Sequence, residues 1–233
     1  MKTGRFEKVY DCISSIKSGK ISINNQIITN PNYFFNPKRD LVKLDNEKIK
    51  SVKKFYFILN KPSGYLSQKS GNEKTIYDIL GKLNLSKEQI QSLFAVGRLD
   101  KDTEGLMILT NDGILSAKLN NPENEIIKKY RAVLKRPISV DNLKLLEKGA
   151  IIEIDNLKYK TMKCKIKKIK ENEVYISIKE GKKRQIRKMF ESVGNEVAYL
   201  KRVSIGGLQL GNLKAGELKE MERDEIYKNI NPD

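Results

Sequence analysis

The sequence contains no histidine among its 233 residues. This absence excludes Ser-His-Asp triads, histidine acid–base catalysis and histidine-ligated metal sites, because each of these needs an imidazole. Any chemistry must therefore come from Asp, Glu, Tyr, Lys, Arg, Ser or Cys. Tryptophan is also absent, so a protein of this composition that stacks nucleic-acid bases would use Tyr, Phe or Arg.

Cysteine is scarce and long apolar runs are missing. Cys12 and Cys164 lie far apart, which leaves neither a disulfide framework nor the spacing of a zinc site. No apolar stretch approaches the roughly 20 residues of a membrane span, and the first residues lack the apolar segment of a secretory signal. We therefore expect a cytoplasmic monomer with no membrane-spanning part and no bound metal.

Positive charge is what the sequence has in excess. It contains 46 Lys and Arg against 29 Asp and Glu, a net charge of +17. Residues 128–202 alone contain 22 basic and 9 acidic residues, whereas a general lysine bias of the genome would spread the excess along the chain. The concentration of charge indicates a polyanionic partner, for which nucleic acid is the usual candidate.

Residues 1–52 are predicted to form a small separate module. Apolar residues recur at helical spacing between residues 6 and 17, which predicts a short helix. Two strand pairs follow, with turns expected at Asn24-Asn25 and Asp45-Asn46, because Asn and Asp tolerate turn conformations.

Residues 53–233 are predicted to form a second, larger module. Phe55–Asn60 and Leu106–Thr110 are continuous apolar runs of the kind that forms buried strands. Further strands are expected at 129–134, 163–169, 174–179 and 197–203. Helices are expected at 75–83, 87–93, 114–119, 141–148 and 184–193. This mixture predicts an α+β fold with a mixed, mainly antiparallel sheet.

The stretch GRLDKDTEG, residues 97–105, has alternating acids that look like the opening of a calcium-binding EF-hand loop. Such a loop needs a bidentate Glu at its twelfth position and a helix after it. Counting from Asp100, the twelfth position holds Asn111, and Glu104 stands where Asp or Asn is usual. The residues that follow favour a strand, so we expect no calcium site.

Asp100 lies between two apolar segments, FAV and LMILT. A carboxylate at the edge of a core needs a partner, and arginine suits it because it keeps the carboxylate charged and oriented. An oriented carboxylate shielded from water can act as a nucleophile or a base. The plainer interpretation is an acidic turn that caps backbone amides.

Two further segments combine cations with apolar or aromatic residues. In EGKKRQIRKMF, the residues Arg184, Arg187 and Lys188 form a basic stripe along the expected helix. This stripe would hold phosphates and turn one arginine toward Asp100, or it is a solvated helix face. In KKYRAVL, Tyr130 stands among cations on a strand, where a half-buried structural tyrosine is the alternative.

Together these segments resemble a known family. GRLDKDTEGLMILTNDG is similar to the active-site motif of pseudouridine synthases. KPSGY before it, and KKYRAVL, EGKKRQIRKMFESVG and IGGLQLGNLKAGE after it, stand in the order of the RsuA/RluB/RluE/RluF branch. The resemblance covers residues 56–225. It implies a catalytic domain that isomerises a specific uridine of ribosomal RNA to pseudouridine, with no cofactor and no metal.

The resemblance implies roles for three catalytic residues. Asp100 would attack a flipped-out uridine, either at the base ring or by starting a sugar-centred route. Tyr130 would stack on the uracil and assist removal of the final proton, and Arg187 would pair with Asp100. Lys61 and Pro62 match a strand-end motif of the family for which a structural role is expected.

The resemblance also implies which residues bind the RNA. Arg98 would occupy the space that the flipped uridine leaves, or hold its phosphate. The other RNA-binding residues would be Lys129, Lys183, Arg184 and Lys188. A basic cleft is expected, because a uridine must leave its stack to be reached and cations hold the splayed backbone.

Residues 1–52 resemble part of an S4-like RNA-binding domain, the usual companion of the catalytic domain in this branch. SIKSGKISINNQ and DLVKLDNEKI carry this resemblance. The usual first helix is absent or reduced to MKTGRFEK, so we expect a shortened, truncated S4-like module. The alternative for the whole chain is a non-catalytic RNA-binding or ribosome-assembly protein on the same fold.

Overall fold

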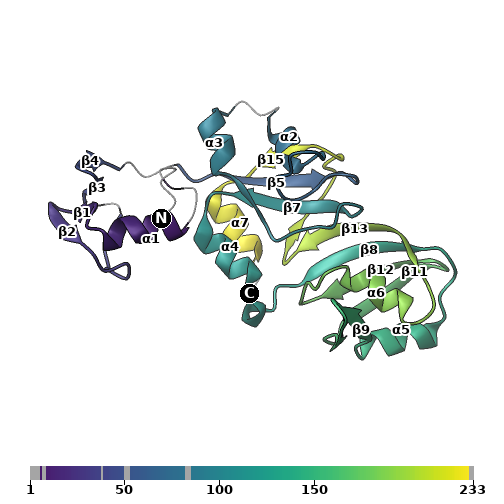
Figure 1. Ribbon diagram of the computed structural model, residues 1–233. Helices are drawn as coiled ribbons and strands as arrows, with labels where there is room; N and C mark the ends of the chain where they lie inside the picture. The colour runs from purple at the N-terminus through teal and green to yellow at the C-terminus, as the bar shows by residue number, and fades with distance from the viewer. Residues whose placement is uncertain (1–5, 7–8, 38, 50–52, 82–84, 231–233) are drawn as a thin grey trace. The chain divides into compact units, whose positions relative to one another are not determined.

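Figure 1 shows the computed structural model of the chain. The structure describes residues 6, 9–37, 39–49, 53–81 and 85–230. The chain divides into two compact units, residues 1–54 and 55–233. Each unit has a hydrophobic core of its own.

The described part of the first unit contains a helix and a four-stranded antiparallel sheet of order β2-β1-β3-β4. Its elements are α1 (Val9–Lys17), β1 (Ile21–Ile23), β2 (Gln26–Ile28), β3 (Val42–Leu44) and β4 (Glu47–Lys48). The expected helix begins earlier, at residue 6, but residues 7 and 8 lie outside the described residues.

Both predicted turns of the first unit are confirmed. Asn24 and Asn25 have φ angles of 50° and 67°, and Asp45 and Asn46 have φ angles of 48° and 67°. Asn and Asp enter this left-handed region more easily than other non-glycine residues. Two consecutive residues of positive φ make the tight turn whose twist matches that of the flanking strands.

The second unit is built on a nine-stranded sheet with the order β11-β12-β8-β13-β7-β5-β15, in which β6 also pairs with β7 and β14 with β13. The strands are β5 (Tyr56–Lys61), β6 (Phe94–Val96), β7 (Glu104–Thr110), β8 (Lys128–Leu134), β11 (Lys165–Lys170), β12 (Glu173–Ile178), β13 (Val197–Ile205), β14 (Leu208–Gln209) and β15 (Leu218–Glu220). The β7–β13 pair is parallel and the other pairs are antiparallel. The predicted α+β fold with a mainly antiparallel sheet is therefore confirmed.

Short helices and one separate hairpin complete the second unit. The helices are α2 (Ile76–Leu80), α3 (Lys87–Ser92), α4 (Gly113–Asn120), the 3₁₀ turn η1 (Pro122–Asn124), α5 (Val140–Glu147), α6 (Gln185–Glu191) and α7 (Arg223–Ile230). The hairpin pairs β9 (Ile151–Ile154) with β10 (Leu157–Lys160). The α7 helix and this hairpin are not among the predicted elements. Arg184, predicted as the first helical residue, instead precedes α6 with a φ of 52°.

One half of the large sheet is buried on both faces. In β5, Phe57 and Leu59 point into one core, and Tyr56 and Ile58 point into the other. Helices α2, α5 and α6 contribute to the first core, and α4 and α7 contribute to the second (Figure 1). A strand covered on both faces is apolar along its whole length, which explains the unbroken run at Phe55–Asn60.

The other half of the sheet is covered on one face. Alternate residues of β8, namely Tyr130, Ala132 and Leu134, are buried in the first core. Lys129 and Arg131, on either side of Tyr130 in the sequence, point to the opposite face and are half-buried. The strand β8 can therefore contribute residues to two different surfaces of the molecule.

Gly105 allows the two halves of the sheet to meet. It pairs with Arg202 across the parallel β7–β13 contact and has a φ of 117°. A Cβ atom at this position would lie 2.2 Å from the backbone oxygen of Arg202. Glycine is therefore the residue that permits this strand contact directly after the loop that contains Asp100.

Candidate active site

The loop between β6 and β7, residues 97–103, forms one wall of a cavity of about 760 Å³, which we call the cleft. Asp100 is half-buried in this wall. Tyr130 reaches the same cavity from β8, and the segment before α6 closes the opposite side. The cleft is also lined by the cationic residues Arg98, Lys101, Lys182, Lys183 and Arg184.

Lys61, the last residue of β5, holds the backbone of this loop through hydrogen bonds. Its side chain is completely buried, and its Nζ donates to the carbonyl oxygens of Pro62, Lys101 and Thr103 at 3.0, 3.2 and 2.8 Å. Burial lowers the pKa of Lys61 to about 8, although the nearby carboxylates of the loop, led by Asp102, act in the opposite direction. An ammonium group has three N–H donors, so the protonated form satisfies all three carbonyls.

Two further contacts hold the loop on either side of Asp100. The hydroxyl of Ser67 donates to the carbonyl oxygen of Leu99 at 2.7 Å and accepts from the Leu99 amide at 3.0 Å. The amide of Gly64 donates to the carbonyl oxygen of Lys101 at 2.8 Å. The backbone at Asp100 is therefore fixed, while its carboxylate makes no hydrogen bond or ion pair with any residue that the structure describes.

Asp102 pairs with both arginines of the segment 180–190. Arg187 is 7% exposed, and its Nη2 lies 3.1 Å from the Asp102 carboxylate and donates to the Asp102 carbonyl oxygen at 3.2 Å. Its Nη1 donates to the carbonyl oxygen of Val197 at 2.8 Å. Nη1 of Arg184 is 3.2 Å from each carboxylate oxygen of Asp102. The predicted pair between Arg187 and Asp100 is therefore wrong: the arginine binds the acid two residues further along the loop.

Tyr130 lies next to a buried arginine that the sequence did not single out. Arg202 is 3% exposed, and its Nη1 donates to the Tyr130 hydroxyl at 3.4 Å. Its guanidinium carbon is 6.0 Å from the centre of the Tyr130 ring, and its Nε donates to the carbonyl oxygen of Leu106 at 2.7 Å. One signal was available: Arg202 stands two residues after the buried Leu200, so it is a charged residue on the buried side of a strand.

The other predicted RNA-binding residues divide into two groups. Arg98, Lys183 and Arg184 line the cleft as expected. Lys183 also pairs with Asp155 at 2.9 Å, which lowers the pKa of Asp155. Lys188 does not line the cleft, because its Nζ donates to the carbonyl oxygen of Glu153 in β9.

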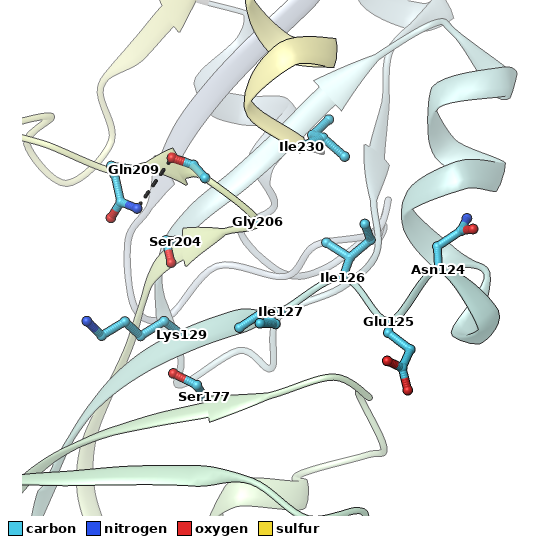
Figure 2. A pocket seen from close by; sticks show the side chains of 11 residues that line it. Asn124, Glu125, Ile126, Ile127, Lys129, Ser177, Ser204, Gly206, Gln209 and Ile230 are labelled. Atoms are coloured by element: carbon cyan, nitrogen blue, oxygen red, sulfur yellow. Dashed lines mark hydrogen bonds between the residues drawn. The ribbon is translucent and has the colours of Figure 1, made fainter. Parts of the chain in front are cut away.

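Lys129 also lies away from the cleft. It follows Lys128 on β8 and lines a different cavity (Figure 2), while its neighbour Tyr130 lines the cleft. Neighbouring residues of a strand point to opposite faces. Lys129 and Lys188 therefore do not line the cleft with Arg184, and their role in RNA binding stays a prediction.

The alternating acids of the loop point in different directions. Asp100 faces the cleft, Asp102 pairs with two arginines, and Glu104 lies 2.6 Å from Nζ of Lys201. Among the described residues, no group of three or more Cys, Asp or Glu side chains could hold a metal ion. In the same part of the chain, no helix is long and apolar enough to cross a membrane.

Comparison with known proteins identifies the family. Residues 55–192 match the family described as RNA pseudouridylate synthase. The chain belongs to this family. It is 35% identical to the uncharacterized RNA pseudouridine synthase YtzG of Bacillus subtilis, over 91% of this chain and 88% of that protein. The prediction that the protein is a pseudouridine synthase is thus confirmed.

Other members of the family are similar over comparable lengths. The ribosomal large subunit pseudouridine synthase B of Bacillus subtilis is 34% identical over 91% of this chain and 86% of its own length. The ribosomal small subunit pseudouridine synthase A of Escherichia coli is 31% identical over 91% and 89%. The crystal structure of a pseudouridylate synthase superposes with a TM-score of 0.69 at 27% identity, covering 94% of this chain and 92% of that chain.

Proposed function

We propose that the protein isomerises one uridine of ribosomal RNA to pseudouridine and that Asp100 is the group that attacks the nucleotide. Relatives named for the large and the small ribosomal subunit support ribosomal RNA as the substrate. The observation that carries the role of Asp100 is its carboxylate, which faces the cleft without a protein partner among the described residues, on a backbone tied down on both sides.

The reaction needs nothing beyond the nucleotide and the protein. The bond from N1 of uracil to C1′ of ribose breaks, a bond from C5 to C1′ forms, and the proton lost from C5 is balanced by the proton gained at N1. Because substrate and product have the same composition, no oxidant, reductant or co-reactant is required. Asp100 would attack either the base or the sugar, and both routes begin at this carboxylate.

Tyr130 and the cations of the cleft supply the other steps. A uridine stacked in RNA must be turned out to reach a half-buried carboxylate. Tyr130 offers a ring for stacking and a hydroxyl for the final proton transfer, and Arg202 holds that hydroxyl from behind. Arg98, Lys183 and Arg184 would bind the phosphates on either side of the displaced nucleotide.

Arg187 would position the loop and the cleft edge without touching the substrate. Its bonds to Asp102 and to Val197 join the β6–β7 loop to β13. The first unit, as an S4-like module, would add RNA contacts of its own. The cytoplasmic location and the monomeric state remain predictions.

One experiment tests this proposal against a non-catalytic RNA-binding protein. The purified chain is incubated with unmodified transcripts of both ribosomal RNAs, and pseudouridine is mapped along each. We expect one modified position with the wild type and none with Asp100→Asn. Asp141→Asn, which removes an exposed carboxylate from α5, is the matched control and should keep full activity. Equal yields from the wild type and Asp100→Asn, or no product from the wild type, would contradict the proposal.

A further inference from the structure

A second cavity, of about 610 Å³, lies on the opposite face of β8 from the cleft; we call it the rear pocket. Its wall includes Lys129 of β8, Ser177 of β12 and Ser204 of β13 (Figure 2). Lys129 is adjacent to Tyr130, which lines the cleft. The two cavities therefore share one strand but open on opposite faces of the sheet.

The strand register brings the polar residues of the rear pocket into one row. Lys129 is the register partner of Ser177 in the β8–β12 pair and of Ser204 in the β8–β13 pair. Directly opposed residues of neighbouring strands have Cβ atoms about 4.5–5.5 Å apart. Figure 2 shows the hydroxyls of Ser177 and Ser204 on either side of the Lys129 side chain. One small ligand can therefore contact both hydroxyls and the Lys129 side chain between them.

The environment of Ser204 is a second observation that indicates a ligand. Its side chain is buried, with 3% of the residue exposed. Its hydroxyl makes no hydrogen bond with any residue in the described part of the chain, and the oxygen is not among the fully buried atoms that lack a partner, so it is accessible from the rear pocket. This hydroxyl lies in the wall of the rear pocket, where a bound group would supply the missing partner.

The rear pocket is lined by one cation, Lys129, and by one carboxylate, Glu125. Nζ of Lys129 lies 4.7 Å from the ring centre of Tyr175 and pairs with no carboxylate among the described residues. The carboxylate in the wall, Glu125, is 2.5 Å from Nζ of Lys179 and is thereby neutralised. The ammonium group at the end of the Lys129 side chain and the hydroxyls of Ser177 and Ser204 offer donors to a ligand that carries negative charge and several acceptor oxygens.

We propose that the rear pocket binds a phosphate group. The phosphate oxygens would accept from Lys129, Ser177 and Ser204, and the apolar wall formed by Ile127 and Ile230 would contact the attached sugar. An RNA backbone and free inorganic phosphate both supply this group. Only the RNA source rests on the proposed function, because phosphate binding here involves neither Asp100 nor the cleft.

The test is a titration of the full ¹⁵N-labelled chain followed by NMR at constant ionic strength. One arm adds inorganic phosphate, and the other adds a synthetic ribosomal RNA fragment. Amide shifts at Lys129, Ser177 and Ser204 with either ligand support the proposal, and the arm that produces them identifies the source. No shift at these amides in either arm would overturn it. Pseudouridine formation is measured separately, so a failure of the proposed function does not affect this result.

Two variants test whether the phosphate binds at Lys129, Ser177 and Ser204. Lys129→Gln should weaken binding at least about 5-fold and reduce the salt slope of RNA binding by about one. Ser204→Ala should weaken binding about 3-fold without lowering the melting temperature, because its hydroxyl has no described protein partner to lose. Lys144→Gln, which removes an exposed charge from α5, should leave binding unchanged. Shifts that persist in both pocket variants would overturn the proposal.

Discussion

Three cations on the cleft side of β8 differ from Lys129 on its other side in whether they have an acidic partner. On the cleft side, Arg184 and Arg187 share the carboxylate of Asp102, and Lys183 pairs with Asp155. On the opposite side, Lys129 pairs with no carboxylate of the described residues. Cations that already have acidic partners are held in fixed positions but gain less from a phosphate. We propose that the paired cations on the cleft side orient the RNA and that Lys129 in the rear pocket adds affinity.

The largest effect on stability is expected from a change at Gly105, where β7 meets β13. Gly105→Ala would place a Cβ atom 2.2 Å from the Arg202 backbone oxygen, at a φ of 117°. We expect the free energy of unfolding to fall by about 3 kcal/mol or more in urea titrations.

Gly113→Ala is the matched control for this change. Nothing lies within 4 Å of a Cβ built at Gly113, and the residue begins α4. Its stability should stay within about 1 kcal/mol of the wild type. A Gly105→Ala protein as stable as Gly113→Ala would show that the β7–β13 contact is not as tight as described.

The second prediction separates the two arginines that share Asp102. Arg187 is buried and does not line the cleft, whereas Arg184 lines it. Arg187→Ala should lower turnover about 100-fold and change RNA affinity less than about 3-fold, because it loosens the catalytic loop. Arg184→Ala should do the reverse, with a weaker Kd and a smaller change in turnover. Equal losses of turnover and affinity in Arg187→Ala would make it a phosphate contact.

The third prediction concerns Asp102, the carboxylate that pairs with Arg184 and Arg187. Asp102→Asn releases Arg184 from its carboxylate partner, so RNA phosphates no longer compete with a protein anion. RNA affinity in filter binding should rise about 3-fold at low salt, while turnover falls about 10-fold because Arg187 is less firmly held. Weaker RNA binding by Asp102→Asn would contradict the difference between the two faces.

The smallest effect concerns Lys61 and pH. Burial lowers its pKa from 10.5 in the unfolded chain to about 8. Between these values the unfolded chain binds more protons than the folded protein, so this residue makes the free energy of unfolding rise with pH. The difference in stability between the wild type and Lys61→Met should grow by roughly 1–2 kcal/mol from pH 8 to 10.5. A difference in stability that stays constant or falls with pH would contradict a lowered pKa of the buried Lys61.

Local rules predicted the parts of the fold that depend on neighbouring residues. The turn at Asn24-Asn25 and the buried strand near Phe55–Asn60 follow from residue type and from an unbroken apolar run. The β9–β10 hairpin has the same kind of turn, with φ angles of 48° and 64° at Asp155 and Asn156. This hairpin was not predicted, although Asp155-Asn156 between IIEI and LKYK has the same turn signal; its strands are short and mostly exposed.

The sequence predicted where the candidate site lies but not which acid of the loop pairs with Arg187. The segment that contains Asp100 was found from its apolar flanks and its family motif. Which loop acid meets Arg187 depends on how Lys61 and Ser67 hold the backbone, from segments about 30 to 40 residues earlier in the chain. The placement of Lys129 could have been foreseen, because the residue next to Tyr130 on a strand must face the other way.

The central claim is that Asp100, and not Asp102, carries out the chemistry. The most direct measurement is the single-turnover rate of pseudouridine formation on one ribosomal RNA fragment, with both variants compared at saturating enzyme. We expect Asp100→Asn to be at least about 10³-fold slower than the wild type, with unchanged RNA affinity and melting temperature, and Asp102→Asn to be about 10-fold slower. A rate for Asp100→Asn within about 10-fold of the wild type, or an equal loss in Asp102→Asn, would contradict the account.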